Sequence, residues 1–166
     1  MVPRRRRWVG VAAGGIAVGL LVATLLFPHT DPLVIHAKVS LIGPRLVYGP
    51  LAADDSRWEV VLTGVETGQV AWLRVAADLR PALDTHPGEQ MLGAVARVLD
   101  VNPLGAIETL LPIYGPDVVC GQDEEGTPLT GPRAERRIRS LGSLGLPRVG
   151  PCLDALRHAP VGRQAG

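Results

Sequence analysis

Apolar residues follow two patterns in this chain: one unbroken run near the start, and short helical stripes further along. The run extends from Trp8 to Phe27 and contains no charged residue. A helix of about 20 apolar residues spans roughly 30 Å, the thickness of the hydrocarbon core of a bilayer. Pro28 follows the run and cannot continue the helical hydrogen bonding. The pattern therefore predicts a transmembrane anchor over residues 8–27.

A basic tail precedes the anchor and predicts its orientation. Arg4, Arg5, Arg6 and Arg7 are consecutive, and cationic residues are retained on the cytoplasmic side during insertion. We therefore expect residues 1–7 in the cytoplasm and residues 28–166 in the periplasm or outside the cell, as in a single-pass protein of the inner membrane. A cleaved signal peptide, which would release a secreted protein, is the alternative, although the run is longer than usual and lacks a clear small-residue cleavage site.

Small residues recur at a spacing of four inside the run. Gly15, Gly19 and Ala23 would share one side of a helix, and such a side lets two membrane helices approach closely. Pairing into a homodimer through this side is one interpretation. The other is that glycine and alanine are simply common in membrane helices and signals, and the sequence does not decide between them.

The juxtamembrane segment, residues 28–55, has the weakest pattern. Ile35, Ala37, Val39 and Leu41 alternate with polar residues, a period of two that is typical of a strand. Gly-Pro pairs at 43–44 and 49–50 then interrupt the chain. A short extended segment within residues 33–48 is therefore expected, with an irregular stretch as the alternative.

Helical stripes begin at Ser56 and define the predicted exported domain, residues 56–159. Ser56 and Glu59 have the spacing of a capping box, Gly68 suits the end of a helix, and Asn102-Pro103 suits the start of one. Apolar residues recur at helical spacing in four stripes: Trp58, Val61, Leu62 and Val65; Trp72, Val75, Ala76 and Leu79; Met91 or Leu92, Val95 and Leu99; and Leu104, Ile107 and Leu111, which Pro112 should stop.

Two further helices are expected after an irregular connection over residues 113–131. Pro132 can open one with Ala134, Ile138 and Leu141 on one side, and the other runs from about Pro151 to His158. Residues 160–166 are expected to be a disordered tail. The predicted fold is all-α: a transmembrane helix followed by a small helical bundle or a short stack of helical hairpins.

Charge is distributed unevenly along the exported part. Residues 54–125 hold 13 acids and 4 arginines, a net charge of −9, whereas residues 126–166 hold 7 arginines and 2 acids, a net charge of +5. This contrast predicts attraction between the two parts, with plain solvated helix surfaces as the alternative. The chain has no basic surface interleaved with aromatic residues, so nucleic-acid binding is excluded.

Cys120 and Cys152 both fall in the exported part. Two thiols in a small domain in an oxidising compartment usually pair. A disulfide between them is therefore expected, with two buried free thiols as the alternative.

Motifs for catalysis, cofactors and metals are absent from the sequence. It contains no G-x-S-x-G, no H-E-x-x-H, no C-x-x-C and no complete phosphate-binding loop. Asp123, Glu124 and Glu125 could supply oxygens to a cation, but a solvated loop explains them better. His86 precedes Pro87 and suits a turn, and as a catalytic base it has no recognisable nucleophile nearby in sequence. We assign no catalytic, cofactor-binding or metal-binding residue.

A segment from Trp72 to Pro81, followed by Asp84, Ala94-Val95 and Asn102-Pro103, resembles a pattern in small exported, mostly helical proteins of Gram-negative bacteria whose function is uncharacterised. The later cysteine pair is similar too. The resemblance covers roughly residues 56–156 and implies the compartment and the helical fold, with no activity.

Function is therefore predicted only as a class. The favoured hypothesis is a non-catalytic, membrane-anchored envelope protein that acts as a scaffold or interaction module for another envelope protein, since helical hairpins form grooves and no catalytic motif competes. The alternatives are an envelope hydrolase or small-ligand binder with an unrecognised site, and an exported inhibitor or immunity-like protein.

Overall fold

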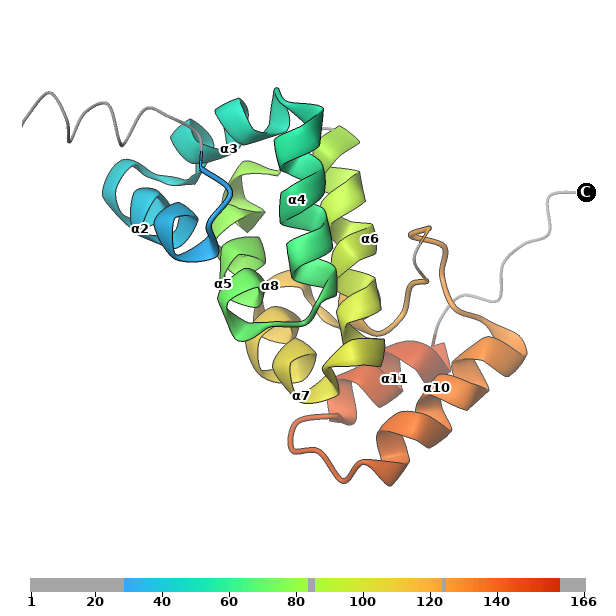
Figure 1. Ribbon diagram of the computed structural model, residues 1–166. Helices are drawn as coiled ribbons and strands as arrows, with labels where there is room; N and C mark the ends of the chain where they lie inside the picture. The colour runs from blue at the N-terminus through green and yellow to red at the C-terminus, as the bar shows by residue number, and fades with distance from the viewer. Residues whose placement is uncertain (1–28, 84–85, 124, 159–166) are drawn as a thin grey trace, which may run out of the picture.

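Helices make up the regular structure throughout the computed structural model, which describes residues 29–83, 86–123 and 125–158. No strand occurs in these ranges, so the all-α prediction is confirmed for them (Figure 1). The main helices are α2 (Pro32–Ile42), α3 (Pro44–Ala52), α4 (Asp55–Glu66), α5 (Val70–Leu79), α6 (His86–Val101), α10 (Gly131–Ser143) and α11 (Gly150–His158). Short elements connect them: η1 (Arg80–Ala82), α7 (Pro103–Gly105), η2 (Ala106–Leu110), α8 (Leu111–Tyr114) and α9 (Pro116–Val119).

Membrane-related predictions fall on residues that the structure does not describe. The anchor at 8–27, the arginines at 4–7, the small residues Gly15, Gly19 and Ala23, and the tail at 160–166 all lie outside the described ranges. Among the helices that are described, none combines the length and the apolar character needed to cross a bilayer.

The expected extended segment within residues 33–48 is wrong, because this stretch forms α2 and α3. Asp31 caps α2: its carboxylate accepts hydrogen bonds from the backbone N–H groups of Leu33 (2.9 Å) and Val34 (3.1 Å). Pro32 and Pro44 each occupy a first helical position, where no N–H is needed. Gly43, with φ of 88°, turns the chain between the two helices. Local capping thus outweighs the alternating pattern.

The central core lies between α4, α5 and α6, which run side by side in Figure 1. Buried side chains confirm the first three predicted stripes, except that Leu62 and Trp72 are only partly buried, while Leu73 is fully buried. Trp58 is 3% exposed, and its indole N–H donates to Oε1 of Gln90 at 3.0 Å, which fastens α4 to α6. Both tryptophans therefore serve packing.

The cap of α4 differs from the prediction. Asp54, not Ser56, accepts the backbone N–H of Arg57 (3.2 Å), and the Ser56 hydroxyl donates to Asp54 at 2.6 Å. This bond from the hydroxyl, together with the one from the Arg57 N–H, lowers the pKa of Asp54. Gly68, at φ of 68°, follows the helix as predicted.

The helical segment that carries the fourth stripe continues through Pro112, whereas the sequence predicted that it ends there. Asn102 caps α7 by accepting the N–H of Gly105 at 2.9 Å, as predicted. Before the proline, η2 widens into a π-helical turn in which the N–H of Leu111 donates to the carbonyl of Ala106. A regular α-helix would bring the proline ring against the carbonyl four residues earlier, and a π turn relieves such a conflict.

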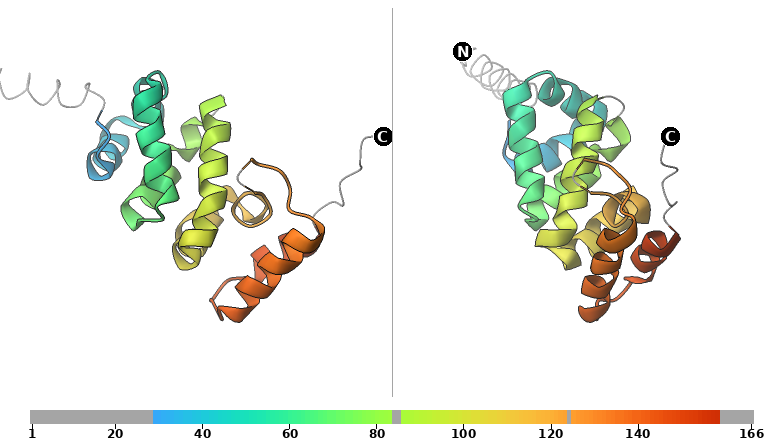
Figure 2. Two further views of the ribbon diagram at one scale, coloured as in Figure 1. Left: turned by 45° about the vertical axis from the view of Figure 1, so that its right-hand side comes forward. Right: turned by 90° about the vertical axis from the view of Figure 1, so that its right-hand side faces the viewer.

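At the C-terminal end, α10 and α11 form a hairpin beside the core (Figures 1 and 2). Ala134, Leu141, Cys152 and Leu156 are buried, which confirms both predicted helices. A disulfide joins Cys120, at the end of α9, to Cys152 on α11, with a Cα–Cα separation of 5.4 Å. The expected irregular connection is partly helical, since it includes α9.

Candidate functional site

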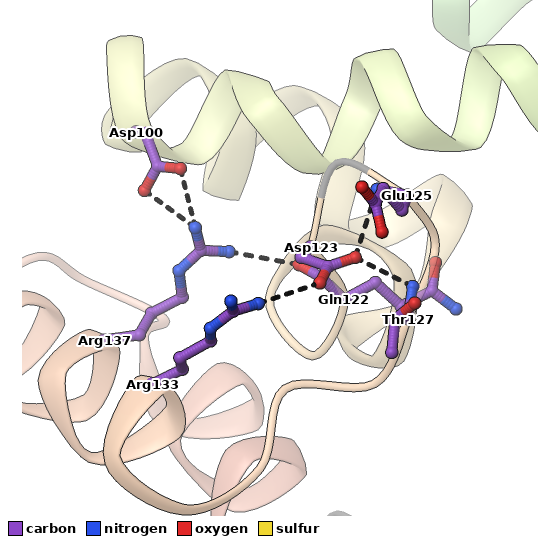
Figure 3. A network of polar contacts seen from close by, with 7 residues as sticks. All are labelled: Asp100, Gln122, Asp123, Glu125, Thr127, Arg133 and Arg137. Atoms are coloured by element: carbon purple, nitrogen blue, oxygen red, sulfur yellow. Dashed lines mark hydrogen bonds and ion pairs between the residues drawn. The ribbon is translucent and has the colours of Figure 1, made fainter.

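A polar cleft lies where the C-terminal hairpin meets the core. It has a volume of about 260 Å³ and is lined by residues from three segments: Ala96, Arg97 and Asp100 on α6, Asp123 and Glu125 in the loop before α10, and Arg133 and Arg137 on α10. Figure 3 shows the two α10 arginines reaching toward α6 and the loop. The cleft is therefore a concave, charged surface that three segments build together.

Arg137 holds the cleft together. Its Nη2 donates to both carboxylate oxygens of Asp100, at 2.6 and 2.8 Å, and its Nη1 donates to the backbone carbonyl of Gln122 at 3.3 Å. The Arg137 side chain is only 15% exposed, whereas that of Asp100 is 65% exposed. One guanidinium group thus joins α10, α6 and the loop.

Asp123 organises the loop that closes the cleft. One of its oxygens accepts the backbone N–H groups of Glu125 (3.1 Å) and Thr127 (2.9 Å), and the other faces Arg133 at 3.4 Å. A backbone bridge between Gln122 and Pro128 completes this turn. The structure therefore gives Asp123 a structural role that the solvated-loop interpretation missed, while Glu125 is exposed and Glu124 lies outside the described residues.

The acidic loop gains no support as a cation site. In the described ranges, no three side chains of His, Cys, Asp or Glu come together in a way that could hold a metal. Two carboxylates of the cleft, Asp100 and Asp123, instead face Arg137 and Arg133, which balance their charge.

Cationic charge extends from the cleft along the outer side of α10. A second hollow of about 310 Å³ is lined by Leu129, Ser140 and the arginines at 133, 136 and 137, together with Asp100. Arg136 and Arg139 are exposed, and among the described residues neither forms an ion pair. Ala134 and Leu141 occupy the opposite, buried side of the helix. We call Arg136 and Arg139 the α10 arginine pair.

Histidines lie away from the cleft. His86 is 77% exposed at the start of α6, and its only described ion-pair neighbour is Glu89 at 3.5 Å. His36 on α2 contacts Asp78 on α5 at 2.5 Å. Ser40 lies one turn along from His36, but its hydroxyl donates to the His36 backbone carbonyl at 3.0 Å. The imidazole therefore has no hydroxyl to activate there, and the arrangement is a surface contact between two helices.

The sequence predicted attraction between the acidic residues 54–125 and the basic residues 126–166, but not which arginines would form ion pairs. Arg133 and Arg137 bind the loop and α6, and the α10 arginine pair faces solvent. The available signal was helical spacing: Arg137 lies three residues after Ala134 and one before Ile138, on the flank of the buried stripe. Asp100 could not be recognised, because it is 37 residues away in sequence.

Comparisons of the chain with protein-family models, with curated proteins and with solved structures found no match. The resemblance to small exported helical proteins therefore stays a prediction.

Proposed function

We propose that this chain is a non-catalytic interaction module of the bacterial envelope, held at the inner membrane by residues 8–27. In this proposal Arg4 to Arg7 stay in the cytoplasm and residues 28–166 face the periplasm. The uncharged run of apolar residues and the preceding arginines support the anchor and its orientation.

The α10 arginine pair is the observation that supports an interaction role. Both guanidinium groups are solvent-facing, and the neighbouring arginines that pair with Asp100 and Asp123 hold the helix in place beneath them. A helix fixed in this way presents preorganised cations, which lowers the entropy cost of binding.

The partner that fits this surface is an acidic segment of another envelope protein. Guanidinium groups recognise carboxylates with directional hydrogen bonds, and an exposed cationic rim accelerates encounter with an acidic partner. A second copy of the chain is a weaker fit, because the Asp123 carboxylate of its acidic loop already accepts two backbone N–H groups and faces Arg133.

A pull-down with the tagged full chain from envelope extract tests the proposal. Arg136→Glu reverses one charge of the pair, while Arg74→Glu makes the same change at an exposed arginine on α5. We expect a partner to be recovered by the wild type and by R74E but not by R136E, and its recovery to decrease as salt rises. Equal recovery by R136E, or no partner together with turnover in a substrate screen, would contradict the proposal.

Topology is tested separately. A reporter enzyme fused after Gly166 should be active in the periplasm and remain with the membrane fraction. A soluble periplasmic product would instead favour cleavage and secretion, and a cytoplasmic reporter would refute the proposed orientation.

A further inference from the structure

Helix α2 is mostly apolar. Its sequence, Pro-Leu-Val-Ile-His-Ala-Lys-Val-Ser-Leu-Ile, holds three polar residues, of which His36 and Ser40 share one exposed edge and Lys38 is buried. Ile35 and Lys38 point inward and are buried against the rest of the fold. Leu33, Ala37 and Leu41 recur every four residues on the opposite side and are exposed. The apolar sides of a helix are normally covered, and the described residues leave the side with Leu33, Ala37 and Leu41 uncovered.

The exposed apolar surface continues onto α3. Leu33, Leu41 and Leu46 are 67%, 70% and 66% exposed, the highest values for large apolar side chains in the described part of the chain. Leu41 and Leu46 lie on either side of the turn at Gly43. We call Leu33, Leu41 and Leu46 the leucine surface.

Charge sets this hairpin apart from the acidic body that follows. Residues 32–53 contain no Asp or Glu, and their basic residues are His36, Lys38 and Arg45. Arg45 is exposed next to Leu46, whereas Lys38 is buried, which lowers its pKa. Exposed leucines beside Arg45, with no carboxylate within residues 32–53 and with Asp31 engaged in capping α2, match the chemistry of an anionic lipid surface.

The chain itself brings the hairpin near a bilayer if residues 8–27 span one. Only residues 28–31 separate Phe27 from Pro32. Five Cα–Cα steps reach at most about 18 Å when fully extended. Because this is less than two helix diameters, α2 would begin close to the end of the membrane span.

Resting on the proposed anchor, we propose that the leucine surface lies in the headgroup region of the membrane and holds the module against the lipid. The occupant of the uncovered side of α2 is then the bilayer surface, with leucine side chains among the upper acyl chains and Arg45 beside anionic phosphates. Such seating would orient the molecule with α10, at the far side of the fold from α2, away from the membrane (Figures 1 and 2).

The test uses the full chain in vesicles of phosphatidylethanolamine and phosphatidylglycerol. Single cysteines replace Leu33, Leu41 or Leu46 and carry nitrobenzoxadiazole, which emits brightly in apolar surroundings. Leu144→Cys, also at an exposed leucine (46%) but at the end of α10, is the matched control. Native Cys120 and Cys152 are buried and joined to each other, so the dye labels the introduced thiol.

We expect spin-labelled lipids to quench the dye on the leucine surface and not at position 144. Dim emission at all four positions, with the chain still in the vesicles after an alkaline wash, overturns the lipid contact while keeping the anchor. Bright emission that spin-labelled lipids do not quench also overturns it, because protein then covers the surface. Loss of the chain in the alkaline wash refutes the anchor, and this inference falls with it.

Discussion

Gly64 and Trp72 form the contact at which the packing of α4 on α5 can be tested most sharply. Gly64 is buried within α4, and a Cβ atom added there would overlap the ring of Trp72, with Cε2 and Cδ2 nearest. The indole is rigid and lies against the α4 backbone at this point. We therefore expect that Gly64→Ala displaces the ring and lowers the free energy of unfolding.

Two opposing effects set the change in the free energy of unfolding that Gly64→Ala causes. Alanine is favoured over glycine in a helix interior by about 1 kcal/mol, whereas overpacking a fitted contact costs about 1–3 kcal/mol. The net loss should be about 1 kcal/mol. In a Trp72→Ala background the overlap is absent, so the same Gly64→Ala change should stabilise by up to about 1 kcal/mol. The sign of the effect thus depends on residue 72.

Urea denaturation of residues 29–166, followed by far-UV circular dichroism, measures this cycle. Gly142→Ala is the control, because a Cβ at position 142 on α10 would meet nothing within 4 Å. It should stabilise equally whether residue 72 is Trp or Ala. The reasoning is refuted if Gly64→Ala stabilises the protein with Trp72 present, or destabilises it to the same extent without the ring.

Three other predictions concern the C-terminal half. Replacing Cys120 and Cys152 with serine removes a crosslink between residues 32 apart and should lower the free energy of unfolding in urea by roughly 3–4 kcal/mol; a loss below about 1 kcal/mol would contradict the loop-entropy argument. In a double-mutant cycle on the free energy of unfolding, Asp100→Asn and Arg137→Gln should show a coupling energy of at most about 1 kcal/mol that weakens with salt, because the Asp100 carboxylate is largely exposed. A coupling energy that does not respond to salt would contradict this, because the ion pair would then be shielded from solvent. The Tyr114 hydroxyl donates to the Ala76 carbonyl at 2.7 Å, and burial raises the pKa of Tyr114. The free energy of unfolding should therefore fall above pH ~10, where the tyrosine of the unfolded chain ionises first. Tyr114→Phe should lower the free energy of unfolding by about 1 kcal/mol at neutral pH and show a smaller decrease at alkaline pH, and identical alkaline profiles of the two proteins would refute the assignment.

Predictions that rest on short-range chemistry agree best with the structure. Asn102-Pro103 and Gly68 act where their capping preferences place them, because each satisfies or redirects backbone groups within a few residues. The disulfide was predictable for another reason: Cys120 and Cys152 are the only two cysteines, so one pairing exists.

Errors occur where distinct patterns compete. Residues 33–48 alternate like a strand, yet Asp31 and two prolines at first helical positions favour helices. Pro112 should end a helix, yet the π turn before it lets the chain continue. In both cases the structure depends on several local preferences, such as capping and proline positions, which one periodic pattern of apolar residues does not describe.

The candidate site was visible only in part. The net charges of −9 over residues 54–125 and +5 over residues 126–166 predicted attraction between the two parts, with solvated helix surfaces as the alternative. Which arginine is neutralised depends on how the C-terminal hairpin docks on α6, because Arg137 finds Asp100 only after the chain has folded back. The docking of the hairpin therefore determines that Arg136 and Arg139 stay without an ion pair among the described residues.

By itself the sequence determined the helical character, most helix ends, the apolar run at the start and the identity of the cysteine pair. These follow from backbone hydrogen bonding, capping and composition, which act over a few residues or need no geometry at all. Tertiary structure alone decided which side of α2 stays uncovered, that Gly64 must remain small beneath Trp72, and which arginines of α10 face solvent. Each of these depends on side chains brought together from distant segments, and only the packing of the helices specifies which segments meet.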